Sequence, residues 1–162
     1  MKKYNILFLC THNSSRSILA EALASTDKSK KFNGYSAGSE PSGKVNQIAK
    51  KLAIQMGYSA EKIRSKNWHE FAKPHSPQMD IIITVCDNAA GEVCPIWPGK
   101  PVTAHWGYPD PSALVGNNEE KLNAFKNVLN SMKCKIQLLS KLPLDSLDNL
   151  SLQNEIKKIE DI

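Results

Sequence analysis

The feature that most constrains the fold is a short, almost wholly apolar run at residues 79–86, Met-Asp-Ile-Ile-Ile-Thr-Val-Cys. Its β-branched side chains favour an extended strand, and a strand that is apolar on both faces must be covered on both sides. Three further short runs also predict strands, at residues 5–10, 32–37 and 101–106. The sequence therefore predicts a sheet with buried strands.

Amphipathic segments lie between these runs and predict the helices that cover the sheet. Residues 44–56 carry apolar side chains at steps of three and four, and Gly57 ends the segment. The longest amphipathic segment spans residues 119–141, and shorter ones span 17–25 and 151–159. Because strands alternate with helices, we expect a three-layer α/β sandwich with a parallel sheet between helices.

The length and composition are those of a single globular domain, which we expect to span residues 1–162. Apolar residues make up 41% of the chain and charged residues 23%, which argues against a disordered chain or a disulfide-dense miniprotein. No apolar run approaches the roughly 20 residues of a membrane span. The apolar stretch near the N-terminus is too short for a signal peptide, so a cytoplasmic protein without membrane contact is expected.

The net charge of +5 mildly favours anionic partners. The lysines are scattered along the chain rather than gathered in one block. Solvated helix faces therefore explain them better than a DNA or RNA surface, and no nucleic-acid partner is expected.

The strongest functional motif is the segment Cys-Thr-His-Asn-Ser-Ser-Arg-Ser at residues 10–17, which joins a predicted strand to a predicted helix. A tight loop at this place turns backbone N–H groups inward, and the helix N-terminus adds partial positive charge, so the loop predicts an anion cradle. The Arg16 guanidinium can bind two oxygens of a tetrahedral oxyanion. The same field favours the thiolate form of Cys10 and makes it the candidate nucleophile. The alternative is a buried Cys10 beside a surface Arg16.

The other loop residues are expected to line the oxyanion site. The hydroxyl groups of Ser14, Ser15 and Ser17 can donate to the Cys10 sulfur or hold the loop open. Asn13 tolerates the left-handed backbone that such a loop demands. The predicted oxyanion-binding residues are Thr11, His12, Asn13, Ser14, Ser15, Arg16 and Ser17.

Asp110 is the candidate proton donor. It stands between Pro109 and Pro111, and these rigid neighbours can hold its carboxyl group steady over a site, as a general acid requires. Proline and aspartate are also ordinary turn formers. Spacing alone supports the two interpretations equally.

The cysteines outside the loop offer a second thiol. A reducing cytoplasm disfavours structural disulfides. Cys86 ends the strongest predicted strand, and strand C-termini in a parallel sheet share one edge, so Cys86 should lie at the same edge as Cys10. Cys86 can then attack a covalent Cys10 adduct, and Cys94 can resolve the disulfide. Zinc binding and plain core packing are the alternatives, although the seven residues between Cys86 and Cys94 suit zinc poorly and no metal is expected. Cys134 lies in the longest predicted helix and is expected to pack either in the core or at the surface.

Taken together, these motifs resemble a known family. Residues 6–22, with residues 35–38 (Tyr-Ser-Ala-Gly), resemble the low-molecular-weight protein tyrosine phosphatase fold. Residues 85–90 (Val-Cys-Asp-Asn-Ala-Ala), 94–95 (Cys-Pro) and 105–111 (His-Trp-Gly-Tyr-Pro-Asp-Pro) are closer to its arsenate reductase branch. The motifs are specific in combination.

The resemblance implies a phosphatase-like core over about residues 4–142 with a four-stranded parallel sheet, followed by a helical extension at residues 143–162. It implies that Cys10 attacks arsenate, that Arg16 binds the oxyanion and that Asp110 protonates the leaving water. It also implies that two further loop residues shape the loop and support the thiolate, namely Asn13 and Ser17.

For thioredoxin-coupled members the resemblance implies a relay. Cys86 attacks the arsenic adduct, arsenite leaves, and a Cys10–Cys86 disulfide remains. Cys94 moves that disulfide to Cys86–Cys94, where thioredoxin reduces it. Thioredoxin, or glutaredoxin with glutathione, is the expected electron donor, and no bound cofactor is expected. These members also hold potassium with an Asp near the place of Ser65 and Lys66, and Lys66 can supply that charge itself, so we expect no potassium.

The resulting hypothesis is an arsenate reductase that acts on a small oxyanion, with phosphate or sulfate as mimics. The alternative is a protein tyrosine or small phosphoester phosphatase that uses the same Cys-x5-Arg loop and does not need Cys86 or Cys94. A third possibility is an oxyanion-binding module without turnover. Phosphatases of this fold usually place Asp-Pro-Tyr further toward the C-terminus, whereas Asp110-Pro111 is followed here by Ser112, which favours the reductase.

Overall fold

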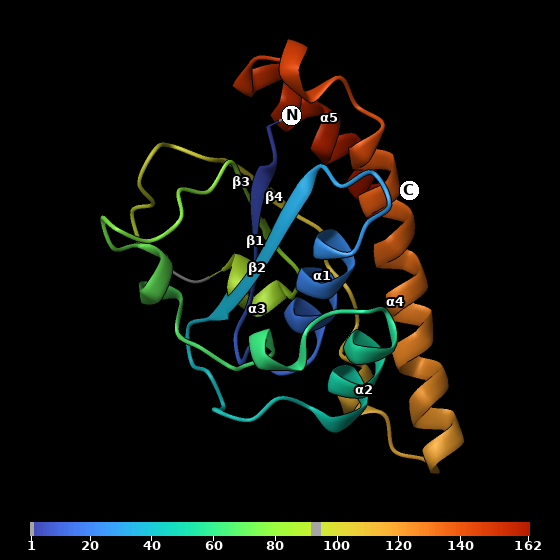
Figure 1. Cartoon of the computed structure of the whole chain (residues 1–162). Coiled ribbons are helices and arrows are strands. Elements are labelled where there is room, and N and C mark those ends of the chain that lie inside the picture. The colour runs from blue at the N-terminus through green and yellow to red at the C-terminus, as the bar shows by residue number, and fades with distance from the viewer. Residues whose placement is uncertain (1, 92–94) are drawn as a thin grey trace.

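The predicted apolar runs form a four-stranded parallel sheet in the order β2-β1-β3-β4 (Figure 1). The computed structural model describes residues 2–91 and 95–162. The strands are β1 Tyr4–Cys10, β2 Phe32–Gly38, β3 Ile81–Thr84 and β4 Val102–His105. The predicted α/β class with a parallel sheet is therefore confirmed.

Helices fill the segments between the strands. The α-helices are α1 Arg16–Ser25, α2 Gln47–Gln55, α3 Asp87–Ala90, α4 Asn118–Ser140 and α5 Asn149–Glu160. The short 3-10 helices are η1 Ala60–Lys62, η2 Trp68–Phe71, η3 Pro111–Ala113 and η4 Leu144–Ser146. No helix in the described ranges is both long enough and apolar enough to cross a bilayer.

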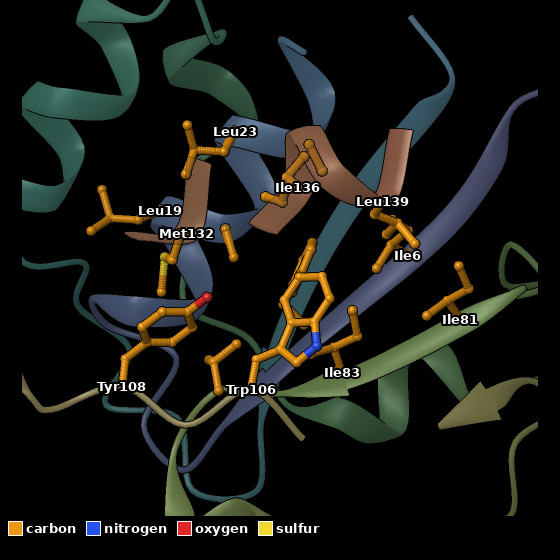
Figure 2. Packing of buried hydrophobic residues seen from close by; sticks show 14 of the residues in the cluster. Ile6, Leu19, Leu23, Ile81, Ile83, Trp106, Tyr108, Met132, Ile136 and Leu139 are labelled. Carbon is orange, nitrogen blue, oxygen red and sulfur yellow. The ribbon is translucent and has the colours of Figure 1, made fainter. Parts of the chain in front are cut away.

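Alternate residues of β1 point to opposite faces of the sheet, as the strand period requires. Ile6 and Phe8 pack on the face covered by α1, α4 and α5. Figure 2 shows Ile6 near Ile136 and Leu139 of α4 on this face. The large apolar cluster there accounts for the amphipathic patterns of the three helices.

The opposite face carries a smaller cluster. Leu7 and Leu9 of β1 pack there with Trp68 and Phe71 of η2 and with Trp97. This face is therefore covered by a 3-10 helix and an aromatic loop residue. Both faces of β1 and β3 are buried along most of their length, which explains why these strands are largely apolar, with only Asn5 and Thr84 half-buried.

The C-terminal segment packs against the core. The indole N–H of Trp106 donates to the Ile156 carbonyl of α5 at 3.1 Å. At the opposite end of the sheet, the Tyr4 hydroxyl donates to the Asp145 carboxylate. That hydrogen bond is the main cause that raises the pKa of Tyr4 to about 12. Residues after α4 thus contact both β1 and the chain beyond β4.

Two local details differ from the predicted elements. Helix α2 starts at Gln47, three residues later than predicted, because the Asn46 side chain accepts from the N–H groups of Ile48 and Ala49 and caps the helix. No element was predicted between the strands at residues 79–86 and 101–106, where α3 lies, or between residues 106 and 119, where η3 lies. These elements have four and three residues, so neither displays a helical period.

Candidate active site

The C-terminal end of β1 and the first turn of α1 place a sulfur beside a hydroxyl group. Cys10 ends β1 and is only 4% exposed. Its Sγ lies 2.9 Å from the Oγ of Ser17, which is fully buried. The loop between them therefore curls back so that its two ends meet.

Asn13 determines the direction of the hydrogen bond to the sulfur. Its φ of 47° is in the left-handed region, as the sequence predicts. Its Nδ2 donates to Ser17 Oγ at 2.8 Å, while its Oδ1 accepts from the Lys66 backbone N–H at 2.9 Å. An amide nitrogen only donates, so Ser17 Oγ accepts from Asn13 and its own hydrogen stays free to donate to Cys10. A hydroxyl that donates to the sulfur stabilises a thiolate.

The backbone of the loop is held from outside. The carbonyl oxygens of Thr11, His12 and Ser14 accept hydrogen bonds of 2.9 to 3.1 Å from backbone N–H groups within residues 40–46. In a trans peptide the following N–H points the opposite way, so the amides that follow these carbonyls are directed away from the 40–46 segment. This is the orientation that an anion cradle requires.

His12 and Ser15 contribute to the loop in different ways. The exposed His12 ring has its Nδ1 3.1 Å from the Glu40 carbonyl, so the contribution of this residue to an anion site comes from its backbone. Ser15 is the N-cap residue of α1, and its side chain makes no capping bond to any described residue. The first turn of α1 also carries no acidic side chain, which leaves the positive end of the helix dipole unopposed there.

Arg16 and Asp110 meet beside the loop. Arg16 Nη1 donates to the Tyr108 carbonyl at 3.0 Å, and Nη2 lies 3.8 Å from Asp110 Oδ2. The other carboxylate oxygen of Asp110 accepts from the backbone N–H and the hydroxyl of Ser112 at 3.0 and 2.7 Å. Asp110 therefore caps the turn with one oxygen and directs the other to the arginine. The turn-forming role is thus observed, and the general-acid role stays a prediction.

Cys86 lies next to the same loop. Its side chain is 2% exposed, and its Sγ is 3.7 Å from Thr11 Oγ1. The Ala89 N–H of α3 donates to this sulfur at 3.4 Å. The structure thus brings Cys86 to the Cys10 loop at the C-terminal edge of the sheet. Cys94 lies outside the described residues, and Cys134 is exposed on α4.

A contact between strands fixes the turn that follows Cys86. His105 Nε2 lies 2.9 Å from Asp87 Oδ1, and His105 Nδ1 lies 2.7 Å from Thr84 Oγ1. The imidazole thereby links the start of α3 to the ends of β3 and β4. The sequence motifs did not predict these contacts, because they join residues 18 and 21 positions apart.

Behind the loop lies a buried polar cluster that the sequence motifs did not identify as a unit. Lys66 Nζ lies 3.5 Å from Glu21 Oε1, and the two side chains are 6% and 5% exposed. Burial lowers the pKa of Lys66, and the Glu21 carboxylate opposes this effect. Burial and the same carboxylate raise the pKa of Tyr58, whose hydroxyl donates to Glu21. The sequence did carry one signal for Glu21. This residue lies between two alanines and four residues after Ser17, which places it on the buried face of α1.

Gly38 allows the loop to approach β2 closely. A Cβ at this position would lie 2.4 Å from the Thr11 carbonyl oxygen and 2.7 Å from that of Cys10. We therefore expect Gly38→Ala to lower the free energy of unfolding by about 1–3 kcal/mol and to weaken oxyanion binding, because the loop backbone must move. Urea unfolding and phosphate titration measure the two effects.

Gly57→Ala is the matched control for this change. The φ of Gly57 is 94°, which is unfavourable for alanine, but a Cβ at this position meets no atom within 4 Å. It should lower stability without weakening oxyanion binding. Equal anion affinities in the two variants would show that contact with Gly38 does not shape the loop.

The family model, a curated relative and a solved structure all indicate similarity to the same family of proteins. Residues 5–150 match the model of the family described as low molecular weight phosphotyrosine protein phosphatase. An arsenate reductase of Halalkalibacterium halodurans is 34% identical over 137 residues, which cover 85% of this chain and 95% of that protein. The structure of an arsenate reductase from Archaeoglobus fulgidus has a TM-score of 0.62 at 27% identity and covers 85% of this chain and 99% of its own.

A third comparison shows the fold alone. A thioredoxin-dependent arsenate reductase from Corynebacterium glutamicum has a TM-score of 0.54 at 23% identity, over 85% of this chain and 63% of that one.

Among the residues that the structure describes, no three His, Cys, Asp or Glu side chains are placed to share a metal ion.

Proposed function

The chain belongs to the low molecular weight phosphotyrosine protein phosphatase family, and we propose that within this family it is an arsenate reductase. Relatives that are at least 30% identical over most of the chain are arsenate reductases. The observation that carries the proposal is the second buried thiol, Cys86, in contact with Thr11 of the Cys10 loop. Phosphoester hydrolysis needs one nucleophile, whereas reduction of arsenate needs two electrons that a pair of thiols can supply.

In the first step the Cys10 thiolate attacks arsenic(V) of arsenate held by the loop amides and Arg16. An S–As bond forms, and an As–O bond breaks as water leaves. Asp110 supplies the proton that the departing oxygen needs, since its Oδ2 faces Arg16 across the site. Ser17 stabilises the thiolate before the attack through its hydrogen bond to Cys10.

In the second step the Cys86 thiolate attacks the Cys10 sulfur. The S–S bond forms, and the electron pair of the S–As bond passes to arsenic, which leaves as arsenite in the trivalent state. The two thiols are thereby oxidised by two electrons, which balances the reduction of arsenic. The hydrogen bond from the Ala89 N–H stabilises the attacking Cys86 thiolate.

The proposal assigns Cys94 the exchange step that moves the disulfide to Cys86–Cys94. Cys94 follows α3 in the sequence, eight residues after Cys86, and is the third thiol that such an exchange needs. Thioredoxin is the proposed electron donor, and glutaredoxin with glutathione is the alternative. Both donors require a reducing compartment, so the proposal includes a cytoplasmic location.

A coupled assay tests the proposed function. Purified protein is given arsenate, thioredoxin, thioredoxin reductase and NADPH, and a separate sample is given an aryl phosphate. We expect NADPH loss that depends on arsenate and produces an equal amount of arsenite. Aryl phosphate hydrolysis without any NADPH loss, including when glutaredoxin, glutathione and glutathione reductase replace thioredoxin and its reductase, would instead identify the phosphatase alternative.

The variant Asp110→Asn distinguishes between the two possible roles of Asp110, general acid and turn former. Asparagine keeps an oxygen for Ser112 but cannot give up a proton, so we expect kcat for arsenate to fall about 10²- to 10⁴-fold. Ser112→Ala is the control, because it removes one hydrogen bond to the Asp110 carboxylate and leaves the acid in place. A kcat in Asp110→Asn that equals the value of the control would assign Asp110 to the turn alone.

A further inference from the structure

The Lys66 ammonium group occupies the centre of a buried ring of oxygen atoms. The side chain comes from the segment between η1 and η2 and is 7% exposed. The distances from Nζ are 2.9 Å to the Arg64 carbonyl oxygen, 3.2 Å to Ser36 Oγ, 3.4 Å to Asn13 Oδ1 and 3.5 Å to Glu21 Oε1. Each of these oxygens can accept a hydrogen bond, so Nζ serves as a donor throughout, as an ammonium group must.

Glu21 provides the matching negative charge. Its side chain is almost fully buried, and the Tyr58 and Ser36 hydroxyl groups donate to its two oxygens. One carboxylate and one ammonium therefore make the cluster neutral. Removal of either partner would leave a single buried charge without compensation, which is strongly unfavourable.

The cluster reaches Cys10 through two residues. Lys66 donates to Asn13 Oδ1 from its backbone N–H and from Nζ. The other end of this amide donates to Ser17, whose own hydrogen remains free for the Cys10 sulfur. Without Nζ, the Asn13 oxygen keeps its hydrogen bond from the Lys66 backbone N–H but loses the one from a positive charge, so the amide is less polarised and its NH₂ becomes a weaker donor. The Ser17 hydroxyl is then less polarised toward the sulfur and stabilises the Cys10 thiolate less.

We propose that the Lys66 ammonium group is the built-in cation of a buried site behind the oxyanion loop, and that it is a positioning residue for Cys10 through Asn13 and Ser17. The potassium ion that the family resemblance implies near Ser65 and Lys66 does not fit these residues, because the ammonium group already lies among the oxygens. The proposal deepens the proposed function, since it concerns the nucleophile of that reaction.

The composition of the ring defines what could replace the ammonium group. One carboxylate with neutral oxygens matches a single positive charge, and the space is that of an ammonium group. The residues Glu21, Tyr58 and Lys66 also line a surface groove of 920 Å³, so a small ion can enter from solvent once the amine is removed. Ammonium and potassium ions have suitable charge and size, whereas choline is too large.

The test uses Lys66→Met, which keeps an unbranched side chain up to the position of Cε and removes the charged Nζ. The rate of Cys10 alkylation by iodoacetamide is followed against pH, with Cys86 and Cys134 replaced by serine in every protein compared and the reaction site checked by peptide mapping. In choline chloride, the midpoint of this profile for Lys66→Met should lie at higher pH than the midpoint for the protein that retains Lys66. Ammonium or potassium chloride at the same ionic strength should return it toward the original value.

Arsenate turnover is the second readout. With all cysteines present, kcat/KM of Lys66→Met in choline chloride should be about tenfold or more below that of the unchanged protein, because the loss weakens a hydrogen bond to a charged group. Ammonium should restore most of this loss. Lys62→Met, which changes an exposed lysine of η1, should respond to no cation.

A double variant separates positioning from folding. Glu21→Gln with Lys66→Met removes both charges, so no unpaired buried charge remains. Its alkylation profile should also move to higher pH, and no cation should reverse the shift, because the attracting carboxylate is gone. If Lys66→Met does not fold, this variant decides the outcome.

The proposal is overturned if the alkylation profile stays unchanged in the variant that folds, or if choline restores Lys66→Met as well as ammonium does. Alkylation requires only the Cys10 thiolate. A failure of arsenate turnover in the unchanged protein would therefore refute the proposed function and leave this test intact.

Discussion

Replacement of Cys86 by serine is expected to abolish arsenate reduction and to preserve phosphoester hydrolysis. Serine retains a hydroxyl group beside Thr11 but offers no thiolate to attack the Cys10 adduct. We expect arsenite production with thioredoxin to fall at least about 10³-fold, while aryl phosphate turnover changes by no more than about threefold. Arsenite measured by chromatography and a colorimetric phosphatase assay give the two rates.

Cys134→Ser is the matched control, because this cysteine is exposed on α4 and has no role in the proposed relay. It should leave both rates unchanged. Equal loss of both activities in Cys86→Ser would show that the residue supports the loop structurally, and retained arsenate reduction would exclude the relay.

Replacement of Arg16 by lysine is expected to affect both reactions together. The guanidinium group donates to the Tyr108 carbonyl and faces Asp110, which places its planar fork beside the loop. A lysine ammonium keeps the charge but cannot bind two oxygens of a tetrahedral anion in one plane. We therefore expect kcat/KM for arsenate and for an aryl phosphate to fall about 10²- to 10³-fold.

Arg64→Lys provides the chemically matched comparison. The Arg64 side chain is about half exposed and pairs with Glu70 at the surface. The Arg64→Lys variant should keep the kcat/KM values for arsenate and for the aryl phosphate near those of the unchanged protein. A similarly small effect of Arg16→Lys would mean that the loop amides bind the oxyanion without the guanidinium fork.

The sequence allowed the layout of the sheet to be predicted because burial leaves a local signal. The apolar runs that became β1 and β3 are covered on both faces, and the helix periods of α2 and α4 match one apolar stripe each. Helix α3 left no such signal, because four residues complete barely one turn. The start of α2 depended on the Asn46 cap, which a periodicity argument does not locate.

The residues of the site also divide into those with a local signal in the sequence and those without one. Cys10, Asn13, Ser17 and Arg16 lie within eight residues, so the strand-loop-helix pattern was sufficient to group them. The placement of Cys86 followed from the shared edge of parallel strands. The Lys66–Glu21 pair joins residues 45 positions apart and the Asp87–His105 pair 18, and no local pattern connects such partners. Long-range polar contacts therefore needed the structure.

The most direct test of the account is a single-turnover reaction of the reduced Cys94→Ser variant with arsenate in the absence of any reductant, analysed by peptide mapping. Without Cys94 the relay should stop after its second step. We predict one arsenite released per protein molecule and a disulfide that joins Cys10 to Cys86. Free Cys10 and Cys86 thiols with no arsenite released would contradict the account.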